Sequence, residues 1–212
     1  GRSAGSLPPA VQEAIALFHR GDISGALARL TPAAGETVAA DEAALRAVYR
    51  AAILLSVGRV TDARTALDAA RAEAPTDDGL ADALAAIISV SQNDRAAALT
   101  EARRATEAGP RQAAPQIALS YALQASFELE AARDALLKAV AHEPDNALAW
   151  ARLAELWLAL GNVREARRAA DRAEALSPDV ERVQTVRGFA ALAEIRTRAA
   201  RAAFEQAITL DP

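Results

Sequence analysis

Few residues of the chain have side chains that could carry catalysis or bind a metal. Its 212 residues include two histidines, His19 and His142, and no cysteine, which excludes a thiolate metal site, a cysteine nucleophile and disulfide bonds. His19 lies at the end of a predicted helix and His142 shortly before a proline, where surface positions are expected. Gly58, Gly161 and Gly188 are isolated and do not form a glycine-rich phosphate loop. We therefore expect no catalytic residue, no metal site and no cofactor, and the chain is not expected to be an enzyme.

The charged residues favour solvated helix faces over a ligand site. One helix interleaves arginines with acids, which predicts local ion pairs worth a few tenths of a kcal/mol each (about 0.2–0.5), with a polyanion site as the alternative. These residues are Arg164, Glu165, Arg167, Arg168, Asp171, Arg172 and Glu174. Asp77 and Asp78 are expected at a helix start, where the helix dipole favours carboxylates.

The overall charge and hydropathy narrow the range of partners. Lysine and arginine total 24 against 28 acids, a net charge of −4, so the basic surface typical of nucleic-acid binding is absent. No apolar run approaches the roughly 20 residues that cross a bilayer, and direct membrane insertion of this segment is not expected. Alanine is by far the most frequent residue, which favours helices because alanine loses no side-chain entropy there. An all-β fold and intrinsic disorder are both disfavoured.

A period of about 34 residues, a length typical of helical repeats, organises these helices. Prolines stand at positions 75, 110, 144, 178 and 212, at a nearly constant spacing, and each stops a helix because proline cannot continue one. Small residues recur in the same register at two positions of each period: Ala63, Ala98, Ala132, Ala166 and Ala200, then Ala70, Ala105, Ala139, Ala173 and Ala207. A turn is expected shortly before each member of the first set, at Gly58, Asn93 and Gly161, with Phe127 and Ile195 in the equivalent places. Each period therefore predicts two helices joined by a short turn.

This pattern resembles the tetratricopeptide repeat (TPR), a unit of about 34 residues with characteristic aromatic, small and closing proline positions. The best match has Trp150, Leu153, Ala154, Trp157, Gly161, Ala166, Ala173 and Pro178. The resemblance implies an all-α, right-handed superhelical solenoid of about twelve antiparallel helices, in which neighbouring repeats bury each other's apolar faces. The tryptophans are expected to be packing residues. We expect an array over residues 7–212, with units at about 7–40, 44–77, 79–112, 113–146, 147–180 and 181–212, of which the first is atypical.

The resemblance also implies a concave groove lined by the first helix of each repeat. The positions carried over are unusually apolar for a groove that should face water, and such a patch usually marks a partner site. They include Val48, Ala52, Leu55, Ile87, Val90, Ile117, Tyr121, Arg152, Glu155, Leu158, Arg182, Thr185 and Phe189, with Leu148 and Leu192 in equivalent places. Arg152 and Arg182 could pair an acidic group of a ligand, or Glu155 could neutralise one of them. The expected ligand is a protein or peptide with an apolar or amphipathic segment, although a helix of the same protein could fill the groove.

The two ends suggest a piece of a larger protein. The first residue is glycine, and residues 1–6 read as a tag remnant. The array stops at Pro212 with Phe204, Ile208 and Leu210 uncovered by a further helix, which predicts either continuing sequence or an end-to-end homodimer. The excess of arginine over lysine and of alanine is typical of a GC-rich bacterial genome. Large alanine-rich arrays of this type resemble periplasmic repeat regions of envelope proteins, which favours the periplasm over the cytoplasm. Two functions remain open: a binding scaffold, as in envelope assembly or secretion systems, and a spacer or regulatory arm of a larger enzyme or regulator.

Overall fold

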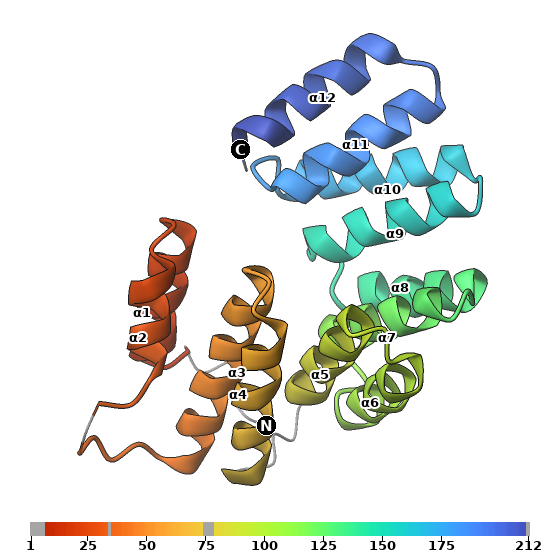
Figure 1. Cartoon of the computed structure of the whole chain (residues 1–212). Coiled ribbons are helices and arrows are strands. Elements are labelled where there is room, and N and C mark those ends of the chain that lie inside the picture. The colour runs from red at the N-terminus through yellow and green to blue at the C-terminus, as the bar shows by residue number, and fades with distance from the viewer. Residues whose placement is uncertain (1–6, 34, 74–78, 211–212) are drawn as a thin grey trace. The chain divides into compact units, whose positions relative to one another are not determined.

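The computed structural model describes residues 7–33, 35–73 and 79–210, and all twelve helices in these ranges belong to six antiparallel pairs (Figure 1). The predicted all-α TPR solenoid of twelve helices is confirmed. The expected tag remnant at residues 1–6, and Asp77 and Asp78, lie outside the described residues. The chain comprises two compact units, residues 1–109 and 110–212.

The first unit contains three helix pairs. Their bounds are α1 Pro9–His19, α2 Ile23–Leu30, α3 Ala40–Ser56, α4 Val60–Glu73, α5 Leu80–Ser91 and α6 Arg95–Ala108. Each pair packs closely, and α3 also contacts α1 and α5. One core cluster joins α3, α4 and α5 through residues such as Leu54, Leu67 and Ile88, and another joins α1, α2 and α3 through residues such as Val11 and Leu30.

The second unit repeats the same arrangement. Its helices are α7 Ala113–Ala125, α8 Leu129–His142, α9 Ala147–Ala159, α10 Val163–Leu176, α11 Glu181–Ala193 and α12 Thr197–Leu210. The first helices of neighbouring pairs, α7, α9 and α11, contact each other. This side-by-side packing places equivalent positions of successive first helices on one surface.

The alanine register determines how closely the helices approach. All ten alanines of the two recurring positions are at most 5% exposed, because they lie where helices cross and a larger side chain would separate them. Gly188 has the same role between α11 and α12, where a Cβ would lie 2.4 Å from Cε1 of Phe204. The small residues of the predicted pattern are therefore contact points between helices.

The turn inside each helix pair has one conformation throughout. The residue two positions after the end of the first helix has a positive φ of 59–79° in all six pairs. Its N–H donates to the carbonyl three residues earlier, and the next N–H reaches back to the last full turn, as in a Schellman motif. The six residues are Gly21, Gly58, Asn93, Phe127, Gly161 and Ile195. Phe127 and Ile195 adopt a conformation that normally favours glycine.

The closing prolines also have a repeated hydrogen-bonding role. Trp150 Nε1 donates to the carbonyl of Pro144 at 2.9 Å, and Gln184 Nε2, one period later, donates to that of Pro178 at 2.7 Å. Arg172 and Gln206, also one period apart, donate to the same two carbonyls at 3.5 Å. The proline carbonyl thus ties the next first helix and the next second helix to the end of each repeat.

Candidate partner-binding surface

The first-helix surface of the second unit exposes several large apolar side chains. Leu148 on α9 is 50% exposed, and Phe189 and Leu192 on α11 are 53% and 45% exposed. Ile117, Tyr121 and Leu158 are half-buried on the same set of helices. Because α9 contacts both α7 and α11, these side chains belong to neighbouring helices. We call the surface formed by α7, α9 and α11 the first-helix face.

Two of the expected groove residues are instead buried. Val48 is 3% exposed and belongs to the core that joins α3, α4 and α5. Arg152 is 4% exposed, a burial that the sequence pattern did not indicate. In the first unit, Ala52 is exposed and Leu55, Ile87 and Val90 are half-buried, so this part presents less large apolar surface than the second unit.

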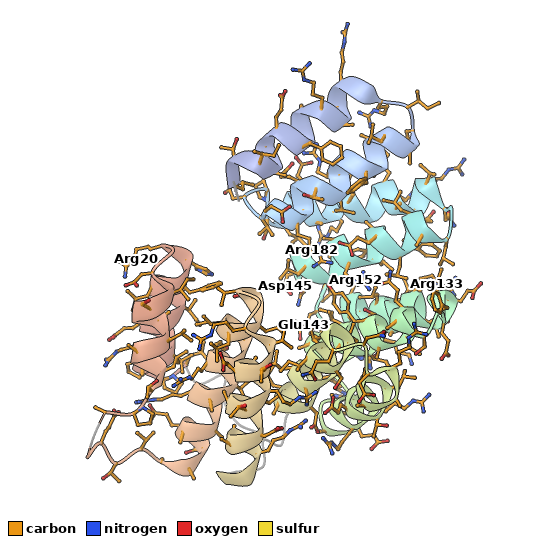
Figure 2. The ribbon with its side chains drawn as sticks, in the orientation of Figure 1. Arg20, Arg133, Glu143, Asp145, Arg152 and Arg182 are labelled. Atoms are coloured by element: carbon orange, nitrogen blue, oxygen red, sulfur yellow. The ribbon has the colours of Figure 1, made fainter. Side chains whose placement is uncertain are left out.

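A charged cluster lies on the first-helix face beside the apolar side chains. Arg152 Nη1 donates to Glu155 at 2.7 Å, and Arg182 donates to both oxygens of Glu155 at 2.9 Å. The second terminal nitrogen of Arg152 donates to Gln124, while its Nε is buried and has no hydrogen-bond partner among the described residues. Arg152 and Arg182 lie on the neighbouring helices α9 and α11 (Figure 2). Glu155 therefore pairs with both arginines, and the cluster has a net charge of +1.

The aromatic ring of Tyr121 packs against both guanidinium groups of this cluster. The guanidinium of Arg152 lies 3.9 Å from the centroid of its ring, and that of Arg182 lies 5.8 Å from it, within the range of cation–π attraction. Burial lowers the pKa of Arg182, but its hydrogen bonds with Glu155 and the carboxylate charge outweigh this effect and raise the pKa above the ordinary arginine value. The Arg182 guanidinium therefore stays charged.

The remaining candidate residues lie where solvent reaches them. His19 and His142 are exposed in the last turns of α1 and α8, as predicted. Arg167 pairs with Asp171 at 3.5 Å and Arg168 with Glu165 at 2.7 Å, which confirms the local ion pairs expected on α10.

Trp157 is half-buried beneath the guanidinium of Arg133, 5.2 Å from its ring centroid. Ile208 is 65% exposed on α12, while Phe204 packs edge-on against Phe189.

Two kinds of feature are absent from the described residues. They contain no group of three or more histidine, aspartate or glutamate side chains that could hold a metal ion. They also contain no helix both long and apolar enough to span a lipid bilayer.

Comparisons with known proteins point to one family. Residues 123–188 match the sequence profile of the tetratricopeptide repeat. None of the curated proteins compared with the chain matches it. The fold is similar to that of a thermophilic TPR protein from Thermus thermophilus, with 22% identity, a TM-score of 0.72, and 80% of this chain and 92% of that chain covered.

Two further solved structures share the fold. A tetratricopeptide repeat protein from Parabacteroides merdae is 14% identical, with a TM-score of 0.72 over 96% of this chain and 78% of that one. The pilF protein of Pseudomonas aeruginosa is 19% identical, with a TM-score of 0.66 over 82% and 78%. The repeat register, the helix pairs and the profile match agree: the chain has the fold of tetratricopeptide-repeat proteins, and residues 123–188 match the sequence profile of that repeat.

Proposed function

We propose that this chain is a non-enzymatic scaffold whose first-helix face binds an apolar or amphipathic segment of a partner protein. Repeats of this kind form scaffolds for protein–protein interaction, with extended binding surfaces built from successive repeats. The observation that carries the proposal is the exposure of Leu148, Phe189 and Leu192 together on α9 and α11. Burying apolar surface contributes roughly 25 cal/mol per Å². A partner helix that covered these side chains would therefore be held by the burial of apolar surface.

The charged cluster sets the orientation of such a segment. Glu155 already accepts hydrogen bonds from Arg152 and Arg182, so the partner does not need to neutralise a free pair of arginines. The Arg182 side chain remains 40% exposed and is the part of the cluster that a partner reaches. An amphipathic helix with its apolar side on Phe189 and a polar or acidic side toward Arg182 fits this surface.

The test compares two double variants with matched loss of exposed apolar surface. Phe189→Ser with Leu192→Ser removes apolar side chains from the first-helix face. Leu137→Ser with Ile208→Ser removes similarly exposed ones, 42% and 65%, from the second helices α8 and α12. Partners captured from lysate by the wild-type chain are identified, and the binding segment is then titrated as a synthetic peptide.

The expected result is a loss of peptide affinity of at least tenfold in the α11 variant and unchanged affinity in the control. This follows from about 1.5–3 kcal/mol for each large apolar side chain that becomes fully buried. Circular dichroism checks that both variants retain their helices. Equal peptide affinity for the two variants would show that the first-helix face is not the binding surface.

The cellular setting is a second part of the proposal. The alanine-rich repeat array resembles the periplasmic repeat regions of bacterial envelope assembly and secretion proteins, and the lack of cysteine is compatible with a periplasmic location. The alternative is a spacer or regulatory arm of a larger enzyme or regulator. The native flanking sequence separates these settings: a signal peptide supports the first, and an adjoining catalytic domain supports the second.

A further inference from the structure

A cavity of about 370 Å³ lies in the first unit, between α2, α3 and α4. Its walls come from the end of α2, one side of α3 and one side of α4. Most of the lining side chains are small or aliphatic, including Leu30, Leu54, Ala43, Ala47 and Ala66. A volume of this size is within the range of small-molecule sites, about 300–1,000 Å³.

The cavity exists because α2 is short. It has 8 residues, whereas α4, α6, α8, α10 and α12 have 14 each. The chain leaves the helix after Leu30 and returns to α3 at Ala40, so the last turns of a full second helix are missing beside α3 and α4. The alanines of α3 and α4 that line this space are too small to fill it.

Because α2 ends early, Arg50 lacks the carboxylate partner that the equivalent arginine of a later repeat has. Arg187 on α11 corresponds to Arg50 on α3 in the repeat register, and it pairs with Glu174, in the last turn of α10. That turn is the part of a second helix that α2 lacks. Arg50 lines the cavity and donates to the hydroxyl of Thr31, and no carboxylate of the described residues forms an ion pair with it. The other arginine at the cavity, Arg59, is paired with Asp62 at 2.7 Å.

We propose that this cavity binds a small apolar monocarboxylate, with its carboxylate on the guanidinium of Arg50 and its apolar body against Leu30, Leu54 and the alanines. Charge supports this class of ligand, because Arg50 is a cation paired only with a hydroxyl and Arg59 is already neutralised. The lining supports it as well, because Leu30, Leu54 and the alanines give it an apolar part, while Arg59, Asp62 and Thr65 form a separate polar part. Arginine frequently binds a carboxylate through two parallel N–H···O hydrogen bonds.

The test uses octanoate as the probe, titrated into the whole chain by calorimetry and by NMR. Octan-1-ol and octylamine are matched probes without the negative charge. We expect saturable binding of octanoate and at least tenfold weaker binding of the other two. Equal binding of octanoate and octan-1-ol, or no octanoate binding at millimolar concentration, overturns the proposal.

Two variants of the cavity and one control variant locate the site. Arg50→Gln is expected to weaken octanoate binding about tenfold, the loss of one charged hydrogen-bonded contact. Arg198→Gln, which removes the same charge from an exposed position on α12, leaves binding unchanged. Ala47→Leu fills the cavity and abolishes binding, with circular dichroism to check the fold. Equal octanoate affinity of the Arg50 and Arg198 variants overturns the assignment.

A second pair of probes distinguishes a peptide C-terminus from a free carboxylic acid as the ligand. Acetyl-Ala-Leu with a free carboxylate is compared with its amide: tighter binding of the acid than of octanoate identifies a peptide C-terminus, and weaker binding identifies a free acid. Binding of the amide as tightly as the acid contradicts the role of Arg50. The Phe189→Ser, Leu192→Ser variant binds octanoate normally, so this test is independent of the function proposed for the first-helix face.

Discussion

The guanidinium of Arg152 lies 3.9 Å from the centroid of the Tyr121 ring, on the neighbouring first helix. This contact joins α7 to α9 on the first-helix face. Arg152 is only 4% exposed, and the aromatic ring, Glu155 and Gln124 replace part of the hydration that its guanidinium loses. The cluster is therefore a structural connection between two repeats as well as a feature of the candidate surface.

Glu155→Gln is expected to destabilise the second unit by about 2–4 kcal/mol, because it leaves two arginines, one of them buried, without their carboxylate. Urea unfolding followed by circular dichroism measures this. Glu165→Gln, which removes the exposed partner of Arg168, is the control and should cost under about 0.5 kcal/mol. Equal costs would mean that the buried pair contributes no more than a surface pair.

Replacing Ile195 by glycine should stabilise the chain by about 1 kcal/mol, because the isoleucine side chain adds backbone strain of about 1–2 kcal/mol at a left-handed position. Ile195 has φ 61° and is 85% exposed, so little packing is lost. The greater freedom of glycine in the unfolded chain offsets part of this gain. The reverse change, Gly161→Ala at φ 74°, should lower the melting temperature. A lower melting temperature for Ile195→Gly would contradict this account of the turn.

The contribution of Glu36 to stability should depend on pH. Its pKa is lowered below the ordinary value of 4.5, mainly because it accepts the backbone N–H of Ala33 and also because it pairs with Arg46. A lowered pKa in the folded state gives stability that is present above the unfolded-state pKa and is lost as pH falls through the folded one. Glu36→Gln should thus be less stable than wild type at neutral pH, and the difference should disappear in acid. A difference in melting temperature that stays constant from neutral pH to strong acid would exclude this linkage.

Gly188→Ala should destabilise the contact between α11 and α12 by about 1–3 kcal/mol, the range for overpacking. The new Cβ would lie 2.4 Å from Cε1 of Phe204, so the ring must move. Phe204→Ala removes that ring, and in its background the alanine at 188 should cost much less. Thermal unfolding of the four chains of this double-mutant cycle measures the coupling. Additive costs in the cycle would indicate that the ring does not determine the requirement for glycine.

The repeat register predicted the parts of this structure that depend on local spacing. Ala132 and Ala166 could be placed at helix crossings because a residue's position within the repeat period determines which neighbour it meets. The turn at Phe127 and Ile195 was predictable for the same reason, although neither is a typical turn residue. The first repeat is separated from the second by more than one 34-residue period, since the equivalent turn residues Gly21 and Gly58 are 37 positions apart. The structure places this excess in the connection between α2 and α3.

The sequence by itself determined the fold class, the helix pairs and the exposed positions of His19 and His142. The tertiary structure decided which groove candidates face solvent, burying Val48 and Arg152 and exposing Phe189. It also decided that Arg50 faces a cavity beside a shortened helix. The physical reason is that helix formation and repeat pairing follow from spacing along the chain, whereas burial and charge pairing depend on side chains that only folding brings together. Glu155 and Arg182, for example, are distant in sequence and 2.9 Å apart in the structure.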